Sequence, residues 1–141
     1  PEKFESRTSK TMDNACYAVK KGGVVVMLSE CPDIYEPEEF SQWFNYDTKL
    51  EMEKALRDAF TIPGWVALKE IECSNVATFI MVTRAENFEL VRKTGMIPVL
   101  SLDEGMALAK EKCTAAKPQY IVMPQGANTV PLYEGRPQIT D

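Results

Sequence analysis

Histidine is missing from this sequence altogether, with none among its 141 residues. Histidine is the commonest metal ligand in proteins and the side chain best suited to proton transfer near neutral pH. The four cysteines do not replace it as metal ligands, because they are widely spaced and form no CxxC or similar short motif. We therefore assign no catalytic residue and no metal ligand to this chain.

The cysteines are also too few to be the framework of a small secreted protein. An even count permits disulfides, but the density is far below that of disulfide-rich scaffolds. Cys16 and Cys113 fall on the apolar faces of expected helices, where a free cysteine packs as a small hydrophobe. Cys31 follows an apolar run, but no neighbouring base or cation is present to activate its thiolate. We expect buried, reduced thiols.

An excess of positive charge and a long apolar run are absent as well. The 21 acidic residues outnumber the 16 basic residues, giving a net charge of −5 that disfavours binding to nucleic acid. The apolar run at residues 22–30 is far shorter than the about 20 residues that cross a bilayer. No charged-then-apolar leader opens the chain. These features predict a cytoplasmic protein without a membrane or nucleic-acid partner.

Apolar, β-branched segments alternate with helical patterns along the chain. Strands are expected at residues 23–28, 77–83, 97–100 and 120–123, with Pro98 placing the third at an edge or leaving it barely paired. Helices are expected to begin at Thr48, Thr83 and Ser101, each followed three residues later by Glu. The alternation predicts one α/β domain over residues 1–141, with a mostly parallel, Rossmann-like sheet of about four strands and helices on both faces. Residues 124–141 read as an irregular tail.

Ligands of open α/β sheets bind beyond the carboxyl ends of the strands. The most suggestive segment there is 125–129, where Gly126 lets the backbone approach a ligand and Gln125, Asn128 and Thr129 offer polar groups. A turn of the tail packed against the sheet explains the same residues. Trp65 follows Pro63-Gly64 near a helix start, and it either covers the core or projects into a cleft. These five residues are our candidates for a binding surface.

Three segments resemble one known family. Residues 11–26 read TMDNACYAVKKGGVVV and continue into Ser29-Glu30-Cys31, residues 101–109 read SLDEGMALA, and residues 123–131 read MPQGANTVP. In this order they resemble the C-terminal domain of nickel-dependent lactate racemases. The resemblance runs from position 11 to position 131. The lead-in at residues 1–10 departs from it, because the Tyr-Gln pair and the Pro-Lys-Asp element that face the substrate in the family are missing.

The resemblance implies a role as one part of a two-domain protein. In the family, an N-terminal domain holds a nickel pincer nucleotide, while the C-terminal domain closes the cleft over a small 2-hydroxy acid and supplies a tryptophan that Trp65 would match. This chain is then expected to bind no cofactor itself and to have its own N-terminal catalytic domain as partner. The alternative is a non-catalytic α/β interaction module or small-molecule-binding module.

Overall fold

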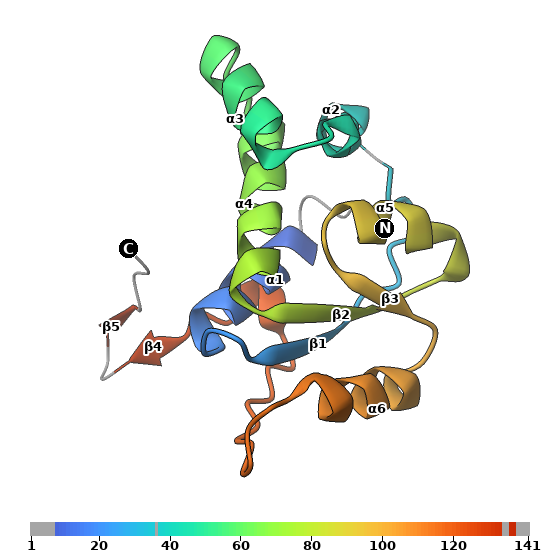
Figure 1. The fold of residues 1–141 in the computed structure, drawn as a ribbon, viewed down its shortest axis with the longest axis vertical. Helices are drawn as coiled ribbons and strands as arrows, with labels where there is room; N and C mark the ends of the chain where they lie inside the picture. The colour runs from blue at the N-terminus through green and yellow to red at the C-terminus, as the bar shows by residue number, and fades with distance from the viewer. Residues whose placement is uncertain (1–7, 36, 134–135, 138–141) are drawn as a thin grey trace.

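The fold is built on a sheet of three parallel strands with helices on both of its faces (Figure 1). The computed structural model describes residues 8–35, 37–133 and 136–137. Strands β1 (Val24–Leu28), β2 (Thr78–Val82) and β3 (Ile97–Val99) form a sheet in the order β1-β2-β3. All of their pairings are parallel, with Val24 opposite Thr78 and Ile80 opposite Ile97. The predicted parallel α/β architecture is confirmed, and the proline-containing β3 lies at an edge.

Helices occupy most of the remaining described chain. They are α1 (Ser9–Ala18), α2 (Glu38–Ser41), α3 (Lys49–Asp58), α4 (Ile62–Val76), α5 (Phe88–Lys93) and α6 (Leu102–Lys112), with 3-10 turns η2 (Gln42–Asn45), η3 (Ala85–Asn87) and η4 (Gly126–Asn128). A short antiparallel pair, β4 (Leu132–Tyr133) and β5 (Arg136–Pro137), follows η4. In the part of the chain that the structure describes, no helix has the length and apolar character needed to cross a membrane.

The strand order fixes where the helices lie. The chain moves from β1 to β2 to β3 in one direction, so right-handed crossovers place α4 and α5 on the same face of the sheet. Figure 1 shows α1 with them and α6 on the opposite face, where α6 packs against all three strands. Helices therefore cover both faces, as predicted.

Local sequence sets the beginnings of the helices. Thr48 and Glu51 form the predicted capping box at the start of α3, and the Ser101 hydroxyl caps α6 by accepting a hydrogen bond from the amide of Glu104. Helix α4 begins at Ile62, where Thr61 is the cap and Pro63 fits the first turn, since its missing N–H is not needed there.

Helix α4 buries a stripe of residues spaced three apart. The buried members are Gly64, Ala67, Glu70 and Cys73. Gly64 is needed for close approach, because a Cβ atom at this position would overlap the ring of Trp43 and the side chain of Leu56. The three small residues let neighbouring elements pack closely on α4, whereas Glu70 is a carboxyl in an apolar setting.

The predicted fourth strand at residues 120–123 is wrong. This segment has no strand pairing, and the side chains of Tyr120, Ile121 and Val122 are 69%, 68% and 82% exposed. The turn that follows is held on α1, where Asn14 Nδ2 donates a hydrogen bond to the carbonyl of Gly126 over 2.7 Å. The segment therefore spans from α6 to α1 and does not join the sheet. The sheet has three strands, since a short apolar run alone does not specify a strand.

Glu70 is the most deeply buried carboxyl among the described residues. Its side chain accepts a hydrogen bond from the hydroxyl of Ser9 at the start of α1, while Oε2 has no hydrogen-bond partner among the described residues. Burial raises the pKa of Glu70 from its ordinary 4.5 to about 8, outweighing the opposing effect of the Ser9 hydrogen bond. The carboxyl is therefore mainly protonated at neutral pH.

This shift predicts that the protein loses stability as the pH rises. The folded state holds the Glu70 proton more tightly than the unfolded state, so its contribution is fully present below pH 4.5 and is lost as the pH rises through about 8. Glu70→Gln keeps a neutral polar group. In denaturant unfolding, the decrease in the free energy of unfolding with rising pH should be smaller in this variant than in the wild type by roughly 2–5 kcal/mol. Glu111→Gln, at an exposed position of α6, is the control, and its free energy of unfolding should depend on pH as in the wild type. An equal pH dependence of the free energy of unfolding in the wild type and in Glu70→Gln would contradict the raised pKa of Glu70.

Candidate functional site

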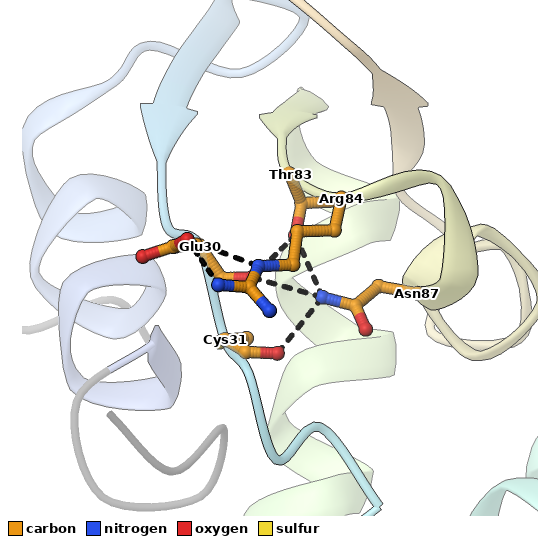
Figure 2. A network of polar contacts seen from close by, with 5 residues as sticks. All are labelled: Glu30, Cys31, Thr83, Arg84 and Asn87. Atoms are coloured by element: carbon orange, nitrogen blue, oxygen red, sulfur yellow. Dashed lines mark hydrogen bonds and ion pairs between the residues drawn. The ribbon is translucent and has the colours of Figure 1, made fainter. Parts of the chain in front are cut away.

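A cluster of polar groups joins the carboxyl ends of β1 and β2. We call it the rim cluster, and it consists of Glu30, Cys31, Thr83, Arg84 and Asn87 (Figure 2). At its centre, Asn87 Nδ2 lies 3.0 Å from the Glu30 carbonyl, 2.9 Å from the Cys31 carbonyl and 2.9 Å from Thr83 Oγ1. One buried amide thus holds the chain leaving β1 against the chain leaving β2.

The sequence predicted that Thr83 caps the next helix, but in the structure Thr83 does not cap it. Its hydroxyl donates to the Glu30 carbonyl over 3.2 Å and accepts from Asn87, so it points across to β1. The chain enters α5 through the 3-10 turn η3, which has Arg84 at its N-cap position and no side-chain cap. Water can solvate the exposed start of η3, so little is lost when the Thr83 hydroxyl is used in the rim cluster and not as a helix cap.

Arg84 and Glu30 form the charged, solvent-facing part of the rim cluster. The guanidinium of Arg84 donates from Nε to Glu30 Oε1 over 3.0 Å, and Nη2 contacts the same oxygen. Both side chains are substantially exposed, and the carboxylate of Glu30 raises the pKa of Arg84. Water screens such a pair, so it orients the two groups more than it stabilises the fold.

Cys31 is sealed beneath this surface. Its side chain is fully buried, and its sulfur lies 3.1 Å from Thr8 Oγ1 and 3.0 Å from Ser29 Oγ, which are 2.8 Å from each other. The backbone at Cys31 has φ +43°, a left-handed conformation that few non-glycine residues adopt. The burial and these hydroxyl contacts give Cys31 a structural place at the end of β1.

Trp65 lies in the first turn of α4 with 49% of its side chain exposed. The other tryptophan, Trp43 of η2, is buried and packs on Gly64, directly beside Trp65 in the chain. Phe60 and Ile62, at the corner between α3 and α4, are also largely exposed. The large apolar side chains at this corner are therefore available for contact with another molecule or domain.

The candidate turn at residues 125–129 lies against α1. The Gln125 carbonyl accepts hydrogen bonds of 2.8 Å from the amide of Asn128 and from Thr129 Oγ1, and the Gly126 carbonyl accepts from Asn14. Gly126 is close to Thr11, which a Cβ atom at this position would overlap. The structure thus gives Gly126 a packing role, while the side chain of Asn128 stays exposed.

The sequence did not single out Asn87, which joins the other members of the rim cluster. It identified the carboxyl ends of the strands as the place where ligands bind, and Glu30, Cys31, Thr83 and Arg84 do meet there. Asn87 follows Thr83 by four residues and lies beyond the expected helix start, so nothing in the local pattern marked it. An asparagine just after a buried parallel strand is the available signal, because its amide can reach carbonyls of the neighbouring strand.

No group of three or more His, Cys, Asp or Glu side chains within the described ranges is arranged to hold a metal ion. A parallel α/β domain hosts many unrelated functions, so the fold by itself does not assign one to this chain. Comparison with known proteins identifies the class further. Residues 6–130 match the family described as "Lactate racemase C-terminal domain", and this chain belongs to that family.

Two similar proteins agree with this assignment. The lactate racemase of Thermoanaerobacterium thermosaccharolyticum is 30% identical over 118 residues, which cover 80% of this chain and 28% of the relative. The solved structure of the lactate racemase apoprotein from the same organism superposes with a TM-score of 0.65 at 30% identity, covering 75% of this chain and 27% of that chain. The chain therefore spans little more than a quarter of the length of these relatives.

The two tryptophans provide a matched pair of stability tests. Trp43 fills the core, so Trp43→Ala should cost about 3–5 kcal/mol of unfolding free energy, as large-to-small aromatic changes do. Trp65 is half exposed, so Trp65→Ala should change stability by no more than about 1 kcal/mol. Denaturant unfolding measures both variants. A loss above about 3 kcal/mol for Trp65→Ala would show that this residue is part of the core.

Asn87 should be far more important for stability than an exposed asparagine. Asn87→Ala leaves the buried Cys31 carbonyl, the part-buried Glu30 carbonyl and the Thr83 hydroxyl without their common donor, and we expect a loss of about 2–4 kcal/mol. Asn75→Ala, at an exposed position near the end of α4, is the control and should stay within about 0.5 kcal/mol. Similar losses in the two variants would refute the role of the amide.

Proposed function

We propose that this chain closes the active-site cleft of a two-domain protein that racemises or epimerises a small 2-hydroxy acid. The observation that carries the proposal is the family match over residues 6–130. The match covers only 28% of the relative, so that lactate racemase contains much more chain than this domain. This supports the proposal that the complete protein has two domains. The missing part is proposed to be an N-terminal catalytic domain, the partner of this chain.

The residues of this chain do not fit a nickel centre. The 141-residue sequence has no histidine, and the described residues contain no suitable cluster of other ligands. The nickel pincer nucleotide implied by the family resemblance is therefore proposed to be held by the N-terminal domain. What this chain can contribute is shape, orientation and the exclusion of water from the cleft.

Trp65 is the residue proposed to line the cleft from this side. It stays half exposed although the next helical residue, Val66, packs against the core, and Phe60 and Ile62 extend its apolar surface. An aromatic wall that excludes water strengthens the interactions of a charged substrate with polar groups opposite it. The same corner would bury its apolar area on contact with the N-terminal domain.

The rival reading is a non-catalytic interaction module or a small-molecule-binding module based on Gln125, Gly126, Asn128 and Thr129. The backbone carbonyls of Gln125 and Gly126 are already used within the domain, which lessens what this turn offers to a ligand. The family match and the exposed corner at Trp65 together favour the cleft-closing role.

Activity measurements on the isolated chain test the proposal. Incubated with one enantiomer of lactate, with or without added nickel, the 141-residue chain should produce none of the other enantiomer by chiral chromatography, because the groups that move the proton and hydride lie in the other domain. Turnover by the pure chain would show that the division of roles is wrong.

The coding sequence upstream of this chain supplies an independent control. A preceding domain with clustered histidines and a lysine for the cofactor would agree with the proposal, and its absence would favour the interaction module. In the complete protein, Trp65→Ala should lower kcat/KM by roughly 10–100-fold while leaving stability nearly unchanged. Unchanged kcat/KM would show that Trp65 does not line the cleft.

A further inference from the structure

Helix α1 is held in the domain mainly by α4 and by the turn at residues 125–129. Its buried side chains, Ser9, Met12 and Ala15, are spaced three residues apart on one side of the helix. Figure 1 shows α1 beside α4, the helix that carries Glu70, and η4 packs against α1 in turn. Because α1 precedes β1, none of the crossovers that join the three strands contains it. Helix α1 can therefore detach without breaking the sheet.

The Glu70 carboxyl joins the two helices. Its Oε1 accepts a hydrogen bond from the hydroxyl of Ser9, which lies in the first turn of α1. Its Oε2 is enclosed and has no hydrogen-bond partner among the described residues, and the residue is only 2% exposed. An ionised carboxylate here would be a buried charge with one oxygen unsatisfied, which is strongly unfavourable. The neutral acid fits this site, and the carboxylate does not.

The charged groups of the surrounding elements do not offset this cost. Ionisable side chains on α4 and on the helices packed against it are Lys69, Glu72 and Cys73 on α4, Lys10, Asp13, Cys16 and Tyr17 on α1, Glu38 and Glu39 on α2, and Lys49, Glu51, Glu53, Lys54, Arg57 and Asp58 on α3. None of these shifts the pKa of Glu70. Burial raises that pKa to about 8, and within the described part of the chain only the Ser9 hydrogen bond opposes it.

We propose that Glu70 is a pH-sensitive switch that keeps α1 docked on α4 while its carboxyl is protonated and releases α1 when the carboxyl ionises. A detached helix of 10 residues is marginally stable in water, so α1 unfolds locally when it is released. The inference does not depend on the proposed racemase role, because it concerns only the contact between α1 and α4. It also goes beyond the loss of overall stability with rising pH, because the sheet stays folded when α1 leaves.

Release of α1 acts on two other parts of the domain. The turn at residues 125–129 depends on α1, because Asn14 Nδ2 donates to the Gly126 carbonyl over 2.7 Å. At the other end of the helix, Thr8 Oγ1 lies 3.1 Å from Cys31 Sγ, so the chain leaving β1 also touches the start of α1. Ionisation of one buried carboxyl would therefore free the candidate binding turn and remove a contact from the carboxyl end of β1.

Amide hydrogen exchange of the 141-residue chain, measured by NMR at a series of pH values, tests the proposal. The amides of α1 should have lower protection factors than those of β2, because α1 opens locally while the sheet stays folded. Opening releases the Glu70 proton, so the protection factors of α1 should fall about tenfold per pH unit between 4.5 and about 8 and then level off. Equal protection factors for α1 and β2 at every pH would overturn the proposal, because α1 would then open only when the whole domain unfolds.

Two variants separate Glu70 from the rest of the interface. Glu70→Gln has no proton to lose, so the protection factors of α1 should no longer depend on pH, whereas the control Glu111→Gln on α6 should match the wild type. Ser9→Ala removes the hydrogen bond that lowers the pKa of Glu70, so the protection factors of α1 should level off at a higher pH than in the wild type. If α1 keeps its pH dependence in folded Glu70→Gln, or levels off at an unchanged pH in Ser9→Ala, Glu70 is not the switch.

Discussion

The pairing of β1 with β2 is the constraint on which the rest of this domain depends. Two strands that are parallel and adjacent need a crossover between them, and here the crossover contains α2, α3 and α4. Closing so long a loop costs chain entropy, which burial of the crossover helices offsets. The pairing is extended at both ends, because Thr78 N donates to the Gly23 carbonyl and Ser29 N donates to the Val82 carbonyl.

The rim cluster follows from this pairing. Once β1 and β2 lie in register, the chain leaving β1 must turn away from the sheet while its carbonyls at Glu30 and Cys31 remain partly or fully buried. Asn87 supplies the missing donor from the beginning of the next crossover. The left-handed backbone at Cys31 belongs to the same turn, and its strain is balanced by the Asn87 hydrogen bond and by the contacts of its sulfur with Thr8 and Ser29.

Sequence patterns predicted the elements whose signal is local. Continuous β-branched runs indicated β1 and β2, the proline placed β3 at an edge, and the Thr48 and Ser101 caps were correct. The failures concern interactions between distant residues. Residues 120–123 have a strand-like composition, but the anchoring of the following turn to α1 decides their path. Thr83 has a capping spacing, but its hydroxyl donates to the part-buried Glu30 carbonyl beyond the end of β1.

The candidate site shows the same division between local and distant information. The sequence could place Trp65 at a helix start, but only the packing of Trp43 on Gly64 shows which tryptophan occupies the core and which stays at the surface. Glu70 extends this reasoning to the interface of α1 and α4. Its carboxyl accepts a hydrogen bond from the Ser9 hydroxyl across that interface, and burial raises its pKa to about 8. The charge state of this carboxyl therefore depends on helix packing between distant parts of the chain, which no local pattern reveals.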